Sequence, residues 1–159
     1  MPSARSKTSI STFGQNKSVA SVLPKGYFQL LNYYRKQFIT LLCMQHDMKL
    51  LEQPFERISK GIKTLELRLY DKKRKALKLG DTIRFSRLPD LTKTVTVKIT
   101  GLLIYHTFAE LLQDLPLSYL GYQESERSSV KKRMCNIYSK EEEAKCGVLG
   151  IRIELLKCF

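Results

Sequence analysis

The alternation of apolar and polar residues after Gly61 is the clearest structural pattern in this sequence. Between Lys63 and Tyr70, leucines occupy every second position and polar residues the positions between them. Successive side chains of a β-strand point to opposite faces of its sheet, so this spacing predicts a strand with a buried leucine face. If Lys63 turns across to the polar face, it joins Glu66 and Arg68 at one end of the strand.

Four further segments have the pattern of strands or of a lead-in to a strand. They cover residues 48–53, 82–87, 94–105 and 148–156. In the second segment, Ile83 and Phe85 are expected to point inward. The third segment is rich in β-branched residues, which favour strands, and its Gly101 is expected at a bulge or a bend.

Helical spacing of apolar residues recurs between these strands. Short helices or helical turns are expected over residues 54–60, 107–114, 117–122, 130–138 and 139–147, with a polar loop over residues 123–129. Thr107 and Ser139 each precede a glutamate by three positions, which predicts capping boxes. In the helix over residues 130–138, Val130, Met134 and Ile137 are expected to face inward.

The N-terminal part of the chain lacks the pattern of a compact domain. Residues 1–26 are rich in Ser, Thr, Lys and Gly without any period, which is typical of a disordered tail. Residues 27–46 have apolar residues at helical spacing and form either a helix or a linker. We therefore expect an N-terminal extension over residues 1–47 and one folded domain over residues 48–159.

The order of these elements favours the α+β class. Strands clustered around two helical insertions, and closed by a C-terminal strand, predict a small mixed β-barrel with helical insertions. The sequence contains neither a Gly-rich phosphate loop nor a nucleophile elbow. The commonest nucleotide-binding and serine-hydrolase motifs are therefore absent.

The charge of the chain narrows the class of partner. With 28 basic and 15 acidic residues the net charge is +13, which favours an anionic partner, most often nucleic acid. The alternative is non-specific adhesion without a function. Two basic clusters stand out, Lys72-Lys73-Arg74-Lys75 and Lys131-Lys132-Arg133. They are either solvated surface or the two sides of a groove that follows a phosphate backbone, in which affinity falls steeply with salt.

No metal, cofactor or membrane partner is predicted. The four cysteines lack the spacing of zinc ligands, and neither His46, in the extension, nor His106 belongs to a metal or triad set. No secretory signal is apparent, so we expect reduced thiols in a cytoplasmic protein. No apolar run approaches the length of a membrane span. The oligomeric state is left open.

The residues Gly61, Lys63, Glu66 and Arg68 form the pattern GxKxxExR, which resembles the signature of the ASCH domain family. The surroundings agree in order, with Pro54-Phe55 before the pattern, Leu79-Gly80-Asp81 after it and Val148-Leu149-Gly150-Ile151 near the end. The resemblance covers about residues 48–157. It implies a PUA-like β-barrel with a cleft between the strand of the pattern and the helical insertion.

The resemblance implies RNA binding and leaves a hydrolase as the alternative. ASCH proteins are thought to bind RNA as coactivators or RNA-processing factors. One branch of small relatives removes the acetyl group of N4-acetylcytidine with a lysine, a threonine and a glutamate, and another cleaves single-stranded RNA. Lys63 matches that lysine, but Glu66 occupies the position of the threonine. A metal-free hydrolase would use Lys63, Glu66 and a glutamate such as Glu124 or Glu126.

Each candidate residue has a functional and a structural interpretation. Lys63 either contacts a ligand or forms a structural ion pair with Glu66. As a ligand contact it would bind a phosphate or, if desolvated, act as a base or nucleophile. Glu66 is expected to orient its cationic neighbours or to accept a proton from a base edge. Arg68 contacts phosphate or a base edge, or forms a salt bridge. Tyr70 stacks on a base or packs in the fold, and Tyr138 is expected to pack in the core.

Overall fold

A computed structural model of the protein describes residues 29–31, 33–34 and 43–156. The chain divides into two units, Met1–Thr40 and Leu41–Phe159. In the first unit, residues 29–31 and 33–34 are helical, which agrees with the helical alternative for that part of residues 27–46. The tail expected over residues 1–26 lies outside the described residues.

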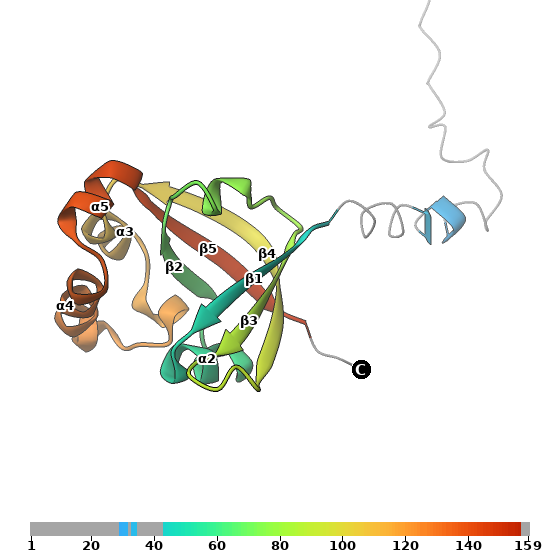
Figure 1. Ribbon diagram of the computed structural model, residues 1–159, viewed down its shortest axis with the longest axis horizontal. Helices are drawn as coiled ribbons and strands as arrows, with labels where there is room; N and C mark the ends of the chain where they lie inside the picture. Colours follow the sequence, from blue (N-terminus) through green and yellow to red (C-terminus); the bar gives the residue numbers. More distant parts are fainter. Residues whose placement is uncertain (1–28, 32, 35–42, 157–159) are drawn as a thin grey trace, which may run out of the picture. The chain divides into compact units, whose positions relative to one another are not determined.

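The second unit is built on one curled sheet of five strands (Figure 1). The strands are β1 (Gln45–Leu50), β2 (Leu65–Leu69), β3 (Thr82–Arg87), β4 (Thr94–Tyr105) and β5 (Val148–Leu155). Their order is β1-β3-β4-β5-β2, in which β1 and β3 are parallel and the other neighbours antiparallel. The sheet is thus a half-barrel with β1 and β2 at its edges, and the predicted mixed α+β fold is confirmed.

Short helices connect the strands. They are α2 (Glu52–Ser59), the 3-10 turn η2 (Arg74–Ala76), α3 (Phe108–Asp114), the 3-10 turns η3 (Leu117–Leu120) and η4 (Glu124–Glu126), α4 (Arg127–Ile137) and α5 (Lys140–Cys146). All elements from α3 to α5 lie between β4 and β5 in the sequence. In Figure 1, α3, α4 and α5 gather on one side of the sheet.

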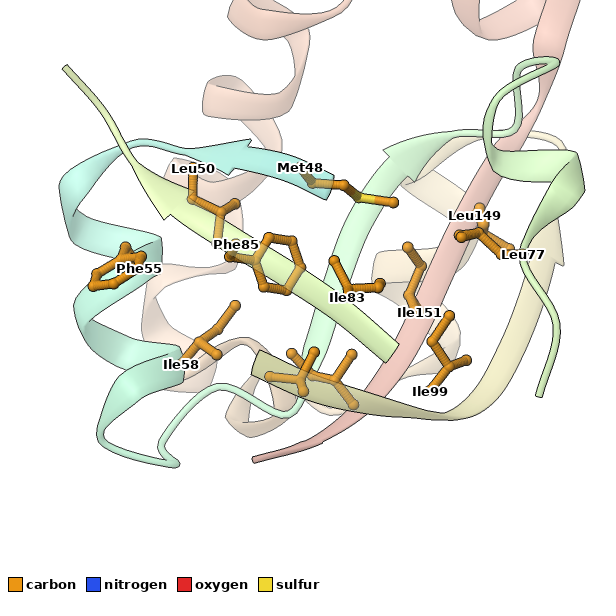
Figure 2. Close-up of a cluster of buried hydrophobic side chains, with 12 residues drawn as sticks. Met48, Leu50, Phe55, Ile58, Leu77, Ile83, Phe85, Ile99, Leu149 and Ile151 are labelled. Carbon is orange, nitrogen blue, oxygen red and sulfur yellow. The ribbon is translucent and has the colours of Figure 1, made fainter. Parts of the chain in front are cut away.

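Apolar residues form two cores, one on each face of the sheet. The first lies within the curl of the sheet beside α2, where Ile83, Phe85 and Ile151 are fully buried (Figure 2). The second lies under the helical layer, where Leu65 and Leu67 of β2 meet apolar residues of α3, η3 and α4. The predicted leucine face of β2 is therefore confirmed, and each face of β2 has its own surroundings.

The fold begins earlier than the sequence pattern indicates. β1 starts at Gln45, three residues before the expected lead-in at Met48, so the helical interpretation is wrong for Gln45 and His46. His46 pairs with Ile83 of β3 and its Nε2 lies 2.8 Å from Oδ2 of the buried Asp81. His46 and its partner Ile83 are 37 residues apart in the sequence, so the spacing of neighbouring apolar residues could not reveal this parallel pairing.

The helical insertion differs from its prediction in two places. The loop expected over residues 123–129 is wrong, because η4 and the first turn of α4 occupy it, and the Glu126 carboxylate accepts from the backbone N–H of Gln123 at 2.8 Å. Ile137 is 49% exposed instead of inward-facing, since α4 fully buries only Val130.

Within the described residues, no helix combines the length and the apolar character needed to cross a membrane.

The predicted caps and bulge are largely confirmed. The register of β4 against β5 shifts between Ile99 and Gly101, as expected for a bulge. Ser139 and Glu142 form the complete capping box of α5. Thr107 caps α3 by accepting from the N–H of Glu110, but the Glu110 carboxylate accepts from the N–H of His106, so that box is only half formed.

Candidate functional site

The turn after α2 brings Lys63 to the charged face of β2. The helix ends before Gly61, whose φ of 70° is one that glycine adopts at little cost. The N–H groups of Ile62 and Lys63 then both donate to the carbonyl of Arg57, which redirects the chain. Lys63 consequently crosses to the side of Glu66, three residues further on, as the sequence pattern suggested.

Lys63, Glu66 and Arg68 form a contiguous charged triad. Lys63 Nζ lies 2.7 Å from Glu66 Oε2, and Arg68 Nε lies 3.0 Å from Glu66 Oε1. Neither of these contacts has the angle of a hydrogen bond, so the attraction of opposite charges holds them. The three side chains are only 11%, 5% and 16% exposed, and two cations against one carboxylate leave the triad with a formal charge of +1.

Arg68 also connects the two edges of the half-barrel. Its Nη2 donates to the backbone carbonyl of Lys49 at 2.9 Å, so the guanidinium of β2 reaches the open edge of β1. Unpaired edge carbonyls are prone to pair with other chains, and Arg68 occupies one of them. This bond gives Arg68 a structural role in addition to its place in the triad.

The triad lies in the wall of a cleft of about 560 Å³. The walls come from the end of β1 and the start of α2, from β2, from η3 and the residue after Gly121, and from α4. Its lining residues are Lys49–Pro54, Lys63, Glu66–Arg68, Leu88, Leu120, Tyr122, Val130, Arg133, Met134, Ile137 and Tyr138. Most of these are apolar, so the cleft offers an apolar surface beside a small net positive charge, which is the usual make-up of a small-ligand site.

Tyr138 lies between the cleft and the second core. Its ring stacks on Phe108 with centroids 5.0 Å apart and an interplanar angle of 18°, which agrees with the expected packing role. Burial raises the pKa of the Tyr138 phenol, and the charge of Glu66 acts in the same direction against the opposing effect of Arg68. Tyr138 therefore presents a neutral hydroxyl next to the triad.

Tyr122 is a lining residue that the sequence did not indicate. The guanidinium carbon of Arg57 lies 3.8 Å from the centre of its ring, and that of Arg133 lies 5.5 Å from it. Arg133 Nη1 also donates to the Tyr122 hydroxyl at 2.5 Å. Only the tertiary fold brings together α2, α4 and the segment that follows η3. The sequence signal for Tyr122 is limited to an aromatic residue directly after a glycine, Gly121, which has a positive φ in the structure.

The first basic cluster lies outside the cleft. Lys73 Nζ donates to the carbonyl of Asp47 at 3.3 Å, and Arg74 pairs with Asp71 at 2.6 Å. Lys72 is exposed, and Lys75 is exposed with its Nζ 5.3 Å from the centre of the Tyr70 ring. Tyr70 packs partly buried against the first core.

The second basic cluster lies on α4 at the cleft. Arg133 lines the cleft, whereas Lys131 and Lys132 are exposed and do not line it. Glu124 lies outside the lining as well. Its carboxylate accepts from the N–H of Leu117 at 2.8 Å and pairs with Arg127, which ties η3 to the start of α4.

The described residues contain no group of three or more His, Cys, Asp or Glu side chains that could hold a metal ion. His46, which is partly buried, instead pairs with the buried Asp81 at the start of β1 and β3. Burial raises the pKa of Asp81, but hydrogen bonds from His46 and from the N–H groups of Met44 and Lys78 outweigh this and keep it below its usual value.

Comparison with known proteins defines the family. The family model of the ASCH domain matches residues 48–157, and the chain belongs to that family. Among solved structures, the hypothetical protein PH0355 is similar with 33% identity and a TM-score of 0.61 over 71% of this chain and 100% of that chain. Protein PF0455 from Pyrococcus furiosus is similar with 31% identity and a TM-score of 0.58, over 72% of this chain and 100% of that one.

A more distant structure shares the fold. The ASCH domain from Lactobacillus crispatus JV V101 aligns with 12% identity and a TM-score of 0.50, over 78% of this chain and 92% of that chain. The curled half-barrel with helices is thus the PUA-like fold of ASCH structures. No curated protein matched the sequence.

Proposed function

We propose that this protein is an RNA-binding ASCH module that holds one nucleotide of a single strand in the cleft over Lys63, Glu66 and Arg68. One observation carries the proposal: a nearly buried triad of formal charge +1 lies in the wall of an otherwise mostly apolar cleft of about 560 Å³. An apolar space beside fixed donors suits a planar, polar-edged base. The ASCH signature formed by these residues, and the RNA binding that it implies, support the same function.

The triad can donate hydrogen bonds to a ligand while its own charges are held in place. A lysine has three N–H donors and an arginine five. These outnumber the contacts that the two cations make with Glu66 and the Lys49 carbonyl, so donors remain for a base edge or a phosphate. Glu66 lies between the two cations and orients both, and its free lone pairs suit a donor on a base edge.

The surrounding charge suits a phosphate backbone outside the cleft. Arg133 lies at the cleft with Lys131 and Lys132 on the same helix, and the protein as a whole carries +13. Exposed cations of this kind attract nucleic acid without reading its sequence. We therefore assign the triad to the nucleotide in the cleft and the basic residues of α4 to the neighbouring backbone.

No observation favours the hydrolase alternative. The threonine of the N4-acetylcytidine branch is replaced by Glu66, whose carboxylate is held between two cations. Glu124 is engaged with Leu117 and Arg127 and does not line the cleft. RNA binding therefore accounts for the charged triad and the cleft without requiring the threonine or a second glutamate at the cleft.

The test is binding of a short single-stranded RNA of mixed sequence, followed by fluorescence anisotropy across a salt series. We expect affinity to fall linearly with salt on logarithmic axes, with a slope of about −0.7 for each phosphate neutralised. The variant Lys63→Gln should weaken binding, and the control Lys145→Gln, on the exposed surface of α5 outside the cleft, should not. Absent or salt-independent binding, or equal effects of the two variants, would refute the proposal.

A further inference from the structure

A second cavity, called the groove below, shares the lining residue Lys63 with the cleft. Its volume is about 470 Å³, and it is lined by Ile58–Gly61, Lys63, Thr64, Val97 and Ile153–Leu155. These residues belong to the C-terminal end of α2, to the turn into β2, and to the strands β4 and β5. No candidate site residue of the sequence analysis except Lys63 lies in this groove.

The cleft and the groove meet at Lys63. The first residues of α2, Glu52–Pro54, line the cleft, and its last residues, Ile58–Ser59, line the groove. Lys63 follows the turn after the helix and lines both. A ligand that continues from the cleft past Lys63 therefore enters the groove.

The groove combines the surfaces that a second nucleotide needs. Leu155, which is half-buried, gives it an apolar part in front of the buried Val97 and Ile153, and Lys60 and Lys63 supply positive charge at the turn. Lys60 is exposed and, among the described residues, has no acidic partner. Glu154, on β5, repels a phosphate from the opposite side of the groove but can accept from a base amino group. A phosphate therefore fits the lysine side and a base fits the strand side.

We propose that this groove binds the nucleotide adjacent to the one in the cleft, with the phosphate between the two nucleotides held by Lys60 and Lys63. The inference rests on the proposed RNA-binding function and adds to it a two-nucleotide footprint. Lys60 becomes a binding residue that acts only on ligands longer than one nucleotide. Phosphate contacts of this kind position a strand without specifying its sequence.

The experiment compares Lys60→Ala with the control Lys145→Ala against two sets of ligands. One set is the four ribonucleosides, which carry no phosphate, and the other is the four homodinucleotides whose only phosphate links the two nucleosides, each titrated by calorimetry. Lys60 is the C-cap of α2, and its cap hydrogen bonds come from backbone N–H groups, so truncating its side chain leaves them in place. Thermal unfolding verifies that the variant is folded. Lys145 is an exposed lysine on α5 that lines neither cavity.

We expect Lys60→Ala to weaken dinucleotide binding about fivefold at 0.1 M salt and by less at 1 M, because one contact to the linking phosphate is lost. Nucleoside binding, and both ligand sets with Lys145→Ala, should be unchanged. Unchanged dinucleotide affinity, or equal losses for nucleosides and dinucleotides, would overturn the two-nucleotide footprint and leave the cleft proposal standing. Failure of both ligand sets to bind the native protein would overturn the proposed function itself.

Discussion

Replacing Glu66 by glutamine tests whether its carboxylate holds the triad together. The change keeps the size and shape of the side chain and removes the single negative charge between Lys63 and Arg68. In the native protein each cation lies within 3.0 Å of a Glu66 oxygen, and all three side chains are nearly buried. After the substitution, two cations remain side by side in the cleft wall with no carboxylate between them.

The expected cost follows from the burial and the distances. At an effective dielectric constant of about 20, each contact contributes roughly 5–6 kcal/mol of Coulomb attraction, much of which offsets the desolvation of the charges. Removing one partner of a buried pair typically costs about 3–5 kcal/mol. Because Lys63 can turn its ammonium group toward water in the cleft, we expect Glu66→Gln to cost about 3 kcal/mol. For a domain of this size that is roughly 12 °C in the midpoint of thermal unfolding.

Urea denaturation of the native protein, Glu66→Gln and a control measures this cost. The control is Glu154→Gln, an exposed carboxylate on β5 without a close ion pair among the described residues, and it should stay within about 0.5 kcal/mol. Adding Lys63→Met to Glu66→Gln should restore part of the loss, since it removes one of the two adjacent cations. A Glu66→Gln variant within 1 kcal/mol of the native protein, or no recovery in the double variant, would refute this account of the triad.

Two further predictions concern the frame around the cleft. Gly121→Ala should destabilise the fold more than Gly61→Ala, because both have positive φ but an added Cβ at Gly121 lies 3.1 Å from the side chain of Ile62, whereas nothing lies within 4 Å at Gly61; equal losses in urea denaturation would contradict this. Asp81→Asn should cost about 1–3 kcal/mol at pH 7 by weakening the contact with His46. Because folding lowers the pKa of Asp81, the ionised carboxylate stabilises the fold fully above its usual pKa of 3.8, and this stabilisation is lost as the pH falls through the folded pKa. Asp81→Asn should therefore lose less stability than the native protein between pH 5 and pH 2. Equal losses in the two proteins would contradict this role of Asp81.

The local pattern of the sequence was sufficient for much of the fold. Strand periodicity located β3, β4 and β5 almost to the residue, because apolar residues alternate with polar ones along β3, along the first part of β4 and toward the end of β5. The bulge at Gly101 and the Ser139 cap were also readable, since both depend on neighbouring residues. The four-residue pattern around Gly61 was enough to suggest the family to which the chain belongs.

What the sequence left open depended on contacts between distant segments. The start of β1 at Gln45 depends on pairing with β3, and the exposure of Ile137 depends on how α4 lies over the second core. Tyr122 is far from the charged pattern along the chain, and only the tertiary packing brings it to the cleft, where its ring contacts Arg57 of α2.

The alternating pattern after Gly61 indicated by itself that Glu66 and Arg68 lie on the face of the strand opposite the leucines, with Lys63 beside them only if the turn carried it across. Periodicity of two assigns side chains to faces but does not state what covers each face. The tertiary structure decided that the charged face lies in the wall of an apolar cleft, that Arg68 reaches Lys49 on the opposite sheet edge, and that a second groove begins at Lys63. The cleft wall and the Arg68 contact come from the curling of the sheet, which brings its edge strands β1 and β2 together, whereas the groove comes from the position of α2 beside β4 and β5.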